Sequence, residues 1–157
     1  MSDVWINSSK KYGKGLTMIE LILVSHGSFA AGLREAAEMI LGEQKQVSVL
    51  GVYQGDSPDS FTGKLEQLID ETGDPKNVLV LSDLQSGTPY NAGMVMALKK
   101  GSACIAGTNL PMLLEILSLR DEVEMEELLQ IACSTGKTGI INSTELLANY
   151  RGKEECK

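Results

Sequence analysis

A single histidine, His26, occurs among the 157 residues of the chain. Histidine is the side-chain type whose unperturbed pKa lies between pH 5 and 8, so proton transfer or nucleophilic attack near neutral pH has one obvious candidate. Asp83 is a candidate partner. A carboxylate that accepts a hydrogen bond from Nδ1–H fixes the tautomer, leaves the Nε2 lone pair free and stabilises positive charge on the ring. The two residues together predict a base or nucleophile that reacts through Nε2.

Residues near this pair favour a bound anion. Gly27 and Gly87 allow close backbone approach, and Thr88 places a hydroxyl at the start of a predicted helix, where free amide N–H groups attract negative charge. The simplest chemistry is transfer of a phosphoryl group onto His26 Nε2 and off again. Structural roles also stay open on these residues alone, because a histidine at a strand end can be a hydrogen-bonded core residue and Asp83 can be a loop cap.

Metal and cofactor chemistry has little support in the sequence. The three cysteines have no metal-ligand spacing, and one histidine cannot complete a zinc set with them. We therefore expect no metal and no cofactor. The cysteines are Cys104, Cys133 and Cys156.

The elements that must position these residues alternate along the chain. Four apolar segments are typical of buried strands, at residues 19–25, 47–52, 78–81 and 103–106, and helical patterns follow them after short connections. This order predicts an α/β fold: a doubly wound, mainly parallel sheet of four strands with helices on both faces. Ligands bind such sheets beyond the carboxyl ends of the strands. His26 and Asp83 can face each other there if the first and third strands are neighbours.

Helical periodicity predicts which side chains face the sheet. The expected inward residues are Phe29, Leu33, Ala36, Ala37 and Ile40 in the first helix, Phe61, Leu65, Leu68 and Ile69 in the second, and Tyr90, Met94, Ala97 and Leu98 in the third. Asn109 is expected to cap a fourth helix that reaches about residue 119, and a fifth covers about 123–133. A short last strand is expected at Ile140-Ile141.

Length and composition predict one domain, since a chain of this size buries an adequate core without disulfides. Residues 1–17 show no periodicity and are expected to be a disordered extension or a remnant of expression; residues 18–143 form the domain, and residues 144–157 a polar tail that frays or forms a short helix. No apolar run approaches the ~18 residues that cross a bilayer. The expectation is a cytoplasmic protein without membrane insertion.

The charge of the chain is acidic. It has 14 basic and 21 acidic side chains, and without residues 1–17 it has 11 and 20, a net charge of about −9. Such a body has no stripe of cations to neutralise phosphates, which argues against a nucleic-acid partner. A protein with a basic face suits it better.

Three segments resemble the signature blocks of the mannose-family IIA component of the bacterial phosphoenolpyruvate-dependent sugar phosphotransferase system. They are residues 22–33, 81–92 and 107–115, and the similarity covers about residues 18–141 in matching order and spacing. The second block usually contains an adjacent pair of glycines, where this chain has Ser86-Gly87.

The resemblance implies a role for each site residue. His26 would receive a phosphoryl group at Nε2 from the phosphocarrier protein HPr and pass it to a IIB domain for sugar uptake. Asp83 would orient and polarise the imidazole, and the Thr88 hydroxyl would contact the phosphoryl group. The resemblance also implies a homodimer that exchanges the last strand, near Ile140-Ile141, between subunits.

Three other functions remain open. The phosphocarrier subunit of a phosphoenolpyruvate-dependent dihydroxyacetone kinase is similar in fold and in its histidine, although Gly27 and the block around Asp83 look more like the sugar-transport branch. A response-regulator receiver would use Asp83 as phosphoacceptor, but it needs an acidic pair after the first strand, where this chain has Ser25-His26. A non-catalytic flavodoxin-like module would have few aromatic residues with which to hold a flavin.

Overall fold

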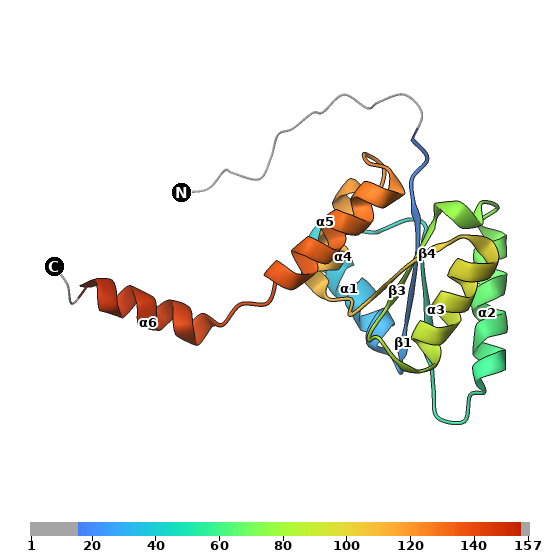
Figure 1. Ribbon diagram of the computed structural model, residues 1–157, viewed down its shortest axis with the longest axis horizontal. Helices are drawn as coiled ribbons and strands as arrows, with labels where there is room; N and C mark the ends of the chain where they lie inside the picture. Colours follow the sequence, from blue (N-terminus) through green and yellow to red (C-terminus); the bar gives the residue numbers. More distant parts are fainter. Residues whose placement is uncertain (1–15, 155–157) are drawn as a thin grey trace.

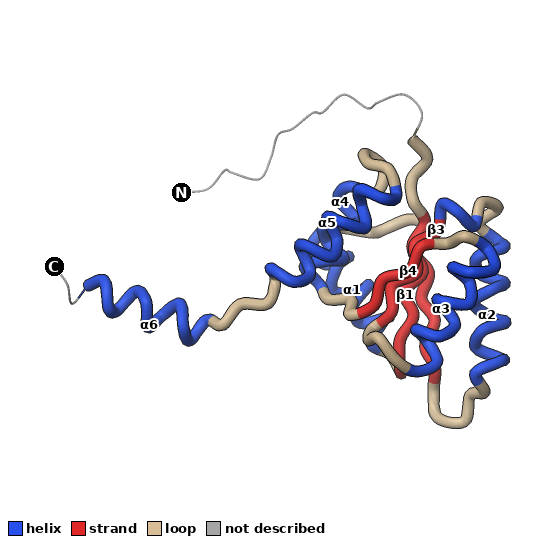
Figure 2. The backbone as a smooth tube through the Cα atoms, in the orientation of Figure 1, coloured by secondary structure: helices blue, strands red, loops and turns tan. Residues whose placement is uncertain are grey.

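The computed structural model describes residues 16–154, which form an α/β fold around one parallel sheet (Figure 2). Its strands are β1 (Glu20–His26), β2 (Val47–Val52), β3 (Val78–Ser82) and β4 (Ala103–Ala106), in the order β2-β1-β3-β4. The predicted fold class is thereby confirmed. The chain passes from β1 to β2 on one side and then crosses to β3 on the other. The strand order therefore reverses between β1 and β3, and this is where ligands bind in sheets of this kind.

Helices cover both faces of the sheet (Figure 1). They are α1 (Phe29–Leu41), α2 (Pro58–Glu71), α3 (Gly87–Lys100), α4 (Leu110–Leu119), α5 (Met125–Thr138) and α6 (Ser143–Glu154), with a 3-10 turn at Pro75–Asn77. Helices α1, α4 and α5 pack on one face, and α2 and α3 pack on the other. Between residues 16 and 154, no helix combines the length and apolar character that crossing a membrane requires.

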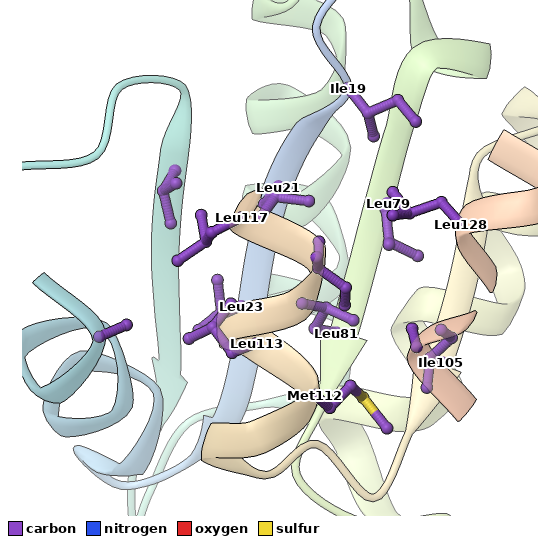
Figure 3. Close-up of a cluster of buried hydrophobic side chains, with 14 of the residues drawn as sticks. Ile19, Leu21, Leu23, Leu79, Leu81, Ile105, Met112, Leu113, Leu117 and Leu128 are labelled. Carbon is purple, nitrogen blue, oxygen red and sulfur yellow. The ribbon is translucent and has the colours of Figure 1, made fainter. Parts of the chain in front are cut away.

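The central strands are apolar on both sides because each face carries its own core. In β1, Leu21 and Leu23 point to the core under α1, α4 and α5, whereas Ile22 and Val24 point to the core under α2 and α3. Figure 3 shows the first of these cores, in which Leu23 lies near Leu113 of α4 and Leu21 lies near Leu117 of the same helix. A rigid strand buried on both faces therefore carries His26 at its end.

Two helices, α2 and α4, begin with a side-chain cap. The Ser57 side chain accepts a hydrogen bond from the Ser60 N–H at 3.1 Å, and Asn109 Oδ1 accepts one from the Met112 N–H at 3.0 Å. The prediction that Asn109 caps the fourth helix is confirmed.

The predicted inward face is correct for α2 and wrong for parts of α1 and α3. Phe29 and Ile40 of α1 are exposed, as are Met94 and Leu98 of α3. The buried residues are instead Ala30 and Ala37 in α1 and Pro89, Ala92, Gly93 and Met96 in α3. Small side chains let these helices approach the sheet closely, and a periodicity based on large apolar residues misses such a face.

The prediction of a strand at Ile140-Ile141 is wrong for the single chain. The two isoleucines lie in the loop between α5 and α6, 79% and 63% exposed. Within residues 16–154 no strand pairs with them, and the intrinsic preference of two residues for extended backbone is too weak to form a strand alone. Helix α6 follows, in agreement with the expected short helix, and extends away from the sheet and its covering helices (Figure 1).

Candidate active site

His26 is the last residue of β1, and Asp83 follows the last residue of β3. The backbone N–H of His26 donates to Asp83 Oδ2 at 2.8 Å, and His26 Nδ1 lies 2.9 Å from the same oxygen. The predicted contact between the two side chains is confirmed. A carboxylate oxygen only accepts, so Nδ1 is the donor, and in the neutral ring Nε2 keeps its lone pair. The imidazole is 48% exposed and the carboxylate 12%.

Hydrogen bonds hold the other oxygen of Asp83 as well. Oδ1 accepts from the Leu84 N–H at 2.9 Å and from the Ser82 hydroxyl at 3.4 Å. Burial raises the pKa of Asp83, but hydrogen bonds from the His26 backbone and ring and from the Leu84 N–H lower it, and the net pKa is below the usual value. Asp83 is therefore an anion at neutral pH and can balance positive charge on the imidazole.

The first turn of α3 lies against Nε2. Gly87 has φ +80°, and a Cβ placed on it would lie 2.8 Å from His26 Nε2 and 3.0 Å from Cε1. Glycine is needed there for its backbone conformation and for the closeness of the ring. Ser86 has φ −169°, an extended backbone that any residue adopts, so a serine fits where the family blocks usually have a first glycine. Thr88 follows Gly87 and is half-buried.

The turn after His26 is held by hydrogen bonds to the end of β2 and to the side chain of Ser25. Gly27 has φ +56°, and its N–H donates to the Val52 carbonyl at 2.8 Å. The buried Ser25 hydroxyl accepts from the Ala30 N–H at 2.8 Å and lies 3.4 Å from the Gly27 carbonyl oxygen. Ser25 therefore stabilises the start of α1, while Ser28 makes no capping bond with its side chain.

Sequence reasoning missed this role of Ser25. The available signal was a serine at the end of an otherwise apolar strand that is buried on both faces.

The polar loop that follows β4, at residues 107–109, has a structural role. The Thr108 N–H and hydroxyl donate to the Ser82 carbonyl at 3.1 and 2.9 Å. The loop after β4 is thus tied to the end of β3, directly before Asp83. Thr108 supports the strand that carries the carboxylate.

Three exposed apolar side chains follow strand ends at the same edge of the sheet. Tyr53 comes after β2, Phe29 begins α1 after the His26 turn, and Leu84 follows Asp83. Exposed apolar side chains near a reactive group favour contact with another protein, because their burial stabilises a complex.

Comparisons with known proteins give one consistent family. The family model EIIA-man, described as "PTS system fructose IIA component", matches residues 20–133. The fructose-specific EIIA component of Bacillus subtilis is 35% identical over 113 residues, which are 71% of this chain and 77% of that protein. The sorbose-specific EIIA component of Lacticaseibacillus casei is 38% identical over 111 residues, covering 70% and 80%.

A longer relative and a solved structure agree. The mannose-specific EIIAB component of Escherichia coli K12 is 34% identical over 124 residues, 78% of this chain but 38% of that protein. The crystal structure of the EIIA component from Streptococcus agalactiae has a TM-score of 0.75 and 29% identity, and the match covers 82% of this chain and 99% of that one. The residues His26 and Asp83 and the turn at Gly87-Thr88 all lie within the matched range, 20–133.

Proposed function

The chain belongs to the mannose-family IIA components of the sugar phosphotransferase system, and from this membership and the site geometry we propose that His26 carries a phosphoryl group between two proteins. By the resemblance, the donor is HPr and the acceptor a IIB domain. The observation that carries the proposal is the 2.9 Å contact between His26 Nδ1 and Asp83 Oδ2, which leaves Nε2 as the free nucleophile beside the first turn of α3.

The transfer is a displacement at phosphorus. Nε2 of His26 forms the new N–P bond while the N–P bond to the donor histidine breaks, and that nitrogen takes back the electron pair. The proton on Nδ1 stays in its hydrogen bond to Asp83. The ring therefore gains positive charge next to the carboxylate, which stabilises it. Transfer to the IIB domain runs the same steps from His26 to the next nucleophile.

The negative charge of the phosphoryl group faces the start of α3. Backbone N–H groups of a first helical turn point toward such an anion, and the positive end of the helix dipole favours it. In this proposal the Thr88 hydroxyl donates to a phosphoryl oxygen, and Gly87 and Gly27 provide close backbone approach on the two sides of the ring.

The alternatives from the sequence have less support. Relatives named as sugar-transport components favour the transport branch over a dihydroxyacetone kinase subunit. Both oxygens of Asp83 already accept hydrogen bonds, which argues against Asp83 as the phosphoacceptor of a receiver. A non-catalytic module gives no reason for a free Nε2 beside a helix start.

Labelling with radioactive phosphoenolpyruvate, enzyme I and HPr tests the proposal. The expected product is an acid-labile, base-stable phosphate, and His26→Ala should abolish it. His26 is the only histidine in the sequence, so any phosphohistidine on this chain identifies its own position. Undiminished labelling of His26→Ala would refute the assignment.

A homodimer belongs to the same proposal, in which residues near Ile140-Ile141 pair with the sheet of a second copy. The outer edge of β4, the last strand in the sheet order, supports it, as do the two exposed isoleucines.

A further inference from the structure

Gly51 lies inside β2, opposite Ser25 of β1 in the strand register. Its backbone is not in the left-handed region, so β2 does not need a glycine there for its conformation. A Cβ at this position would overlap the carbonyl oxygen of Gly27 and would lie 3.0 and 3.2 Å from the Cε2 and Cζ atoms of the Tyr53 ring. A glycine inside a strand often marks such a close approach of backbone.

The carbonyl that approaches Gly51 belongs to the residue after His26. The N–H of Gly27 is bonded to the Val52 carbonyl at 2.8 Å, and its carbonyl oxygen lies 3.4 Å from the Ser25 hydroxyl. On the other side of the imidazole-bearing residue, the His26 N–H is bonded to Asp83. The two peptide groups around His26 are thus held from β2 and from the end of β3.

This turn has little room to move. Nε2 of His26 lies so near the Gly87 backbone that one added carbon there would come within 2.8 Å of it. The Gly27 carbonyl belongs to the peptide between Gly27 and Ser28, so displacing it changes the backbone dihedrals of Gly27, the residue directly after His26. That change would alter the distances from the ring to Asp83 and to the first turn of α3.

We propose that Gly51 is a positioning residue for phosphoryl transfer at His26: the absence of a side chain at Gly51 lets the Gly27 carbonyl settle against β2, and this sets the orientation of the imidazole. The inference rests on the proposed function for its kinetic consequence. The Tyr53 ring can rotate away from a new methyl group, but the Gly27 carbonyl is backbone and can move only with the turn.

The kinetic test uses Gly51→Ala with phospho-HPr as the donor. We expect kcat for phosphorylation of His26 to fall about tenfold or more, because sub-ångström misplacement of reacting groups slows such steps strongly. KM should change less than kcat, because the added methyl group contacts neither Phe29 nor Leu84, two of the three exposed apolar side chains near His26. The matched control is Gly63→Ala in α2, where an added Cβ meets nothing within 4 Å, and its kinetics should equal those of the wild type. An unchanged kcat in folded Gly51→Ala would overturn the inference.

The second measurement needs no phosphoryl transfer. Nitrogen-15 NMR of the unphosphorylated protein reports the His26 ring through its Nδ1–H and Nε2 signals, and the backbone amides report the turn. Gly51→Ala should shift the ring signals and the Gly27 amide, and Gly63→Ala should leave them in place. Unshifted ring signals would contradict the positioning role. If the wild type accepts no phosphate, the proposed function fails, and these spectra still decide the role of Gly51.

Two further variants separate the possible causes. In Gly51→Ala/Tyr53→Ala the new methyl group no longer meets the Tyr53 ring, but it still overlaps the Gly27 carbonyl oxygen. We therefore expect kcat to remain as low as in Gly51→Ala. Recovery to the rate of Tyr53→Ala alone would show that the new methyl group acts through the Tyr53 ring and not through the Gly27 carbonyl. That result would overturn the inference.

If Gly51→Ala does not fold, Ser25→Ala replaces it, because it removes the hydroxyl partner of the same carbonyl without adding atoms. A shift of the His26 ring signals in Ser25→Ala supports the inference, and unshifted signals overturn it.

Discussion

Asp83 has two roles beside His26, charge and orientation, and one substitution disturbs both of them. In Asp83→Asn the amide can still occupy the position, but it carries no charge and can present its NH₂ group to Nδ1, which then favours the wrong tautomer. We expect transfer to His26 to slow by at least ~100-fold with the fold retained, by analogy with carboxylate-to-amide changes at other catalytic histidines. Single-turnover transfer from phospho-HPr measures this rate.

The matched control is Asp74→Asn. Asp74 lies just before the amino end of β3, far from His26, and its carboxylate accepts from the Lys76 N–H at 3.2 Å to cap a short turn. Its rate should equal that of the wild type. Full activity of Asp83→Asn would show that the aspartate is only structural.

The same carboxylate predicts how stability depends on pH. The pKa of Asp83 is lower in the folded protein than its ordinary value, as the hydrogen bonds from His26 and Leu84 outweigh burial. Its contribution to the free energy of unfolding is therefore complete above the unfolded pKa of about 3.9 and is lost as pH falls through the lower folded value. Urea unfolding at pH 7 and at pH 3 should show a smaller acid-induced loss for Asp83→Asn than for the wild type. An equal loss in both proteins would show that these hydrogen bonds do not stabilise the anion.

At the residue scale, the contact between His26 and Asp83 could be predicted, because parallel strands end at one edge and the two residues follow apolar strands. The roles of Gly51 and Ser25 could not. The role of Gly51 depends on where the Gly27 carbonyl lies after a turn with positive φ, and the role of Ser25 depends on where that turn places the Ala30 N–H. No pattern of residue types gives these positions.

At the scale of single elements, the strands were easier to predict than the helix faces. A buried parallel strand is a continuous apolar run, and β3 (Val78–Ser82) is buried at all five positions. Helix α3 instead packs through small residues: a Cβ at Gly93 would come within 2.8 Å of Cys104 Sγ and 3.3 Å of Val80 Cγ1. Burial raises the pKa of that thiol to about 11, so it stays neutral at the interface.

Arg120, at the end of α4, was also missed at this scale. It is buried and donates to the backbone carbonyls of Ile19, Lys45 and Gln46, which joins the amino ends of β1 and β2. An arginine at a helix end looks like a surface residue in the sequence, so nothing in its spacing indicates this role.

The corrected face of α3 predicts opposite results for two apolar residues of that helix. Met96 is fully buried, and Leu98 is 85% exposed. Met96→Ala should lower the free energy of unfolding by about 2–5 kcal/mol through lost burial and a cavity. Leu98→Ala should change it by no more than about 0.5 kcal/mol. Urea unfolding of both variants measures the difference. A larger loss for Leu98→Ala than for Met96→Ala would restore the face expected from periodicity.

At the scale of the whole molecule, the two outer strand edges of the sheet and one segment lack partners within the described chain. The outer edges of β2 and β4 are not paired, and Ile140 and Ile141 are exposed between the folded body and α6 (Figure 1). Apolar residues in a connection raise the free energy of a lone chain in water, and an unpaired edge leaves backbone groups to the solvent. Pairing between two copies would bury the isoleucines and give the backbone groups at the outer edge of β4 hydrogen-bond partners. The sequence could indicate the apolar pair but not that it lies exposed outside the folded body.

Analytical ultracentrifugation at micromolar concentration tests this pairing. The wild type should sediment with about twice the mass of one chain, and Ile140→Asp/Ile141→Asp should move toward one chain mass, because two carboxylates at the contact would lose their hydration on association. Leu98→Asp is the matched control, since it adds a charge at an exposed apolar position on α3 and should leave the mass unchanged. A monomeric wild type would contradict the exchange, and so would an isoleucine double variant that stays dimeric. If the double variant becomes monomeric and still accepts phosphate at His26, then the site is complete within one chain and dimerisation serves stability.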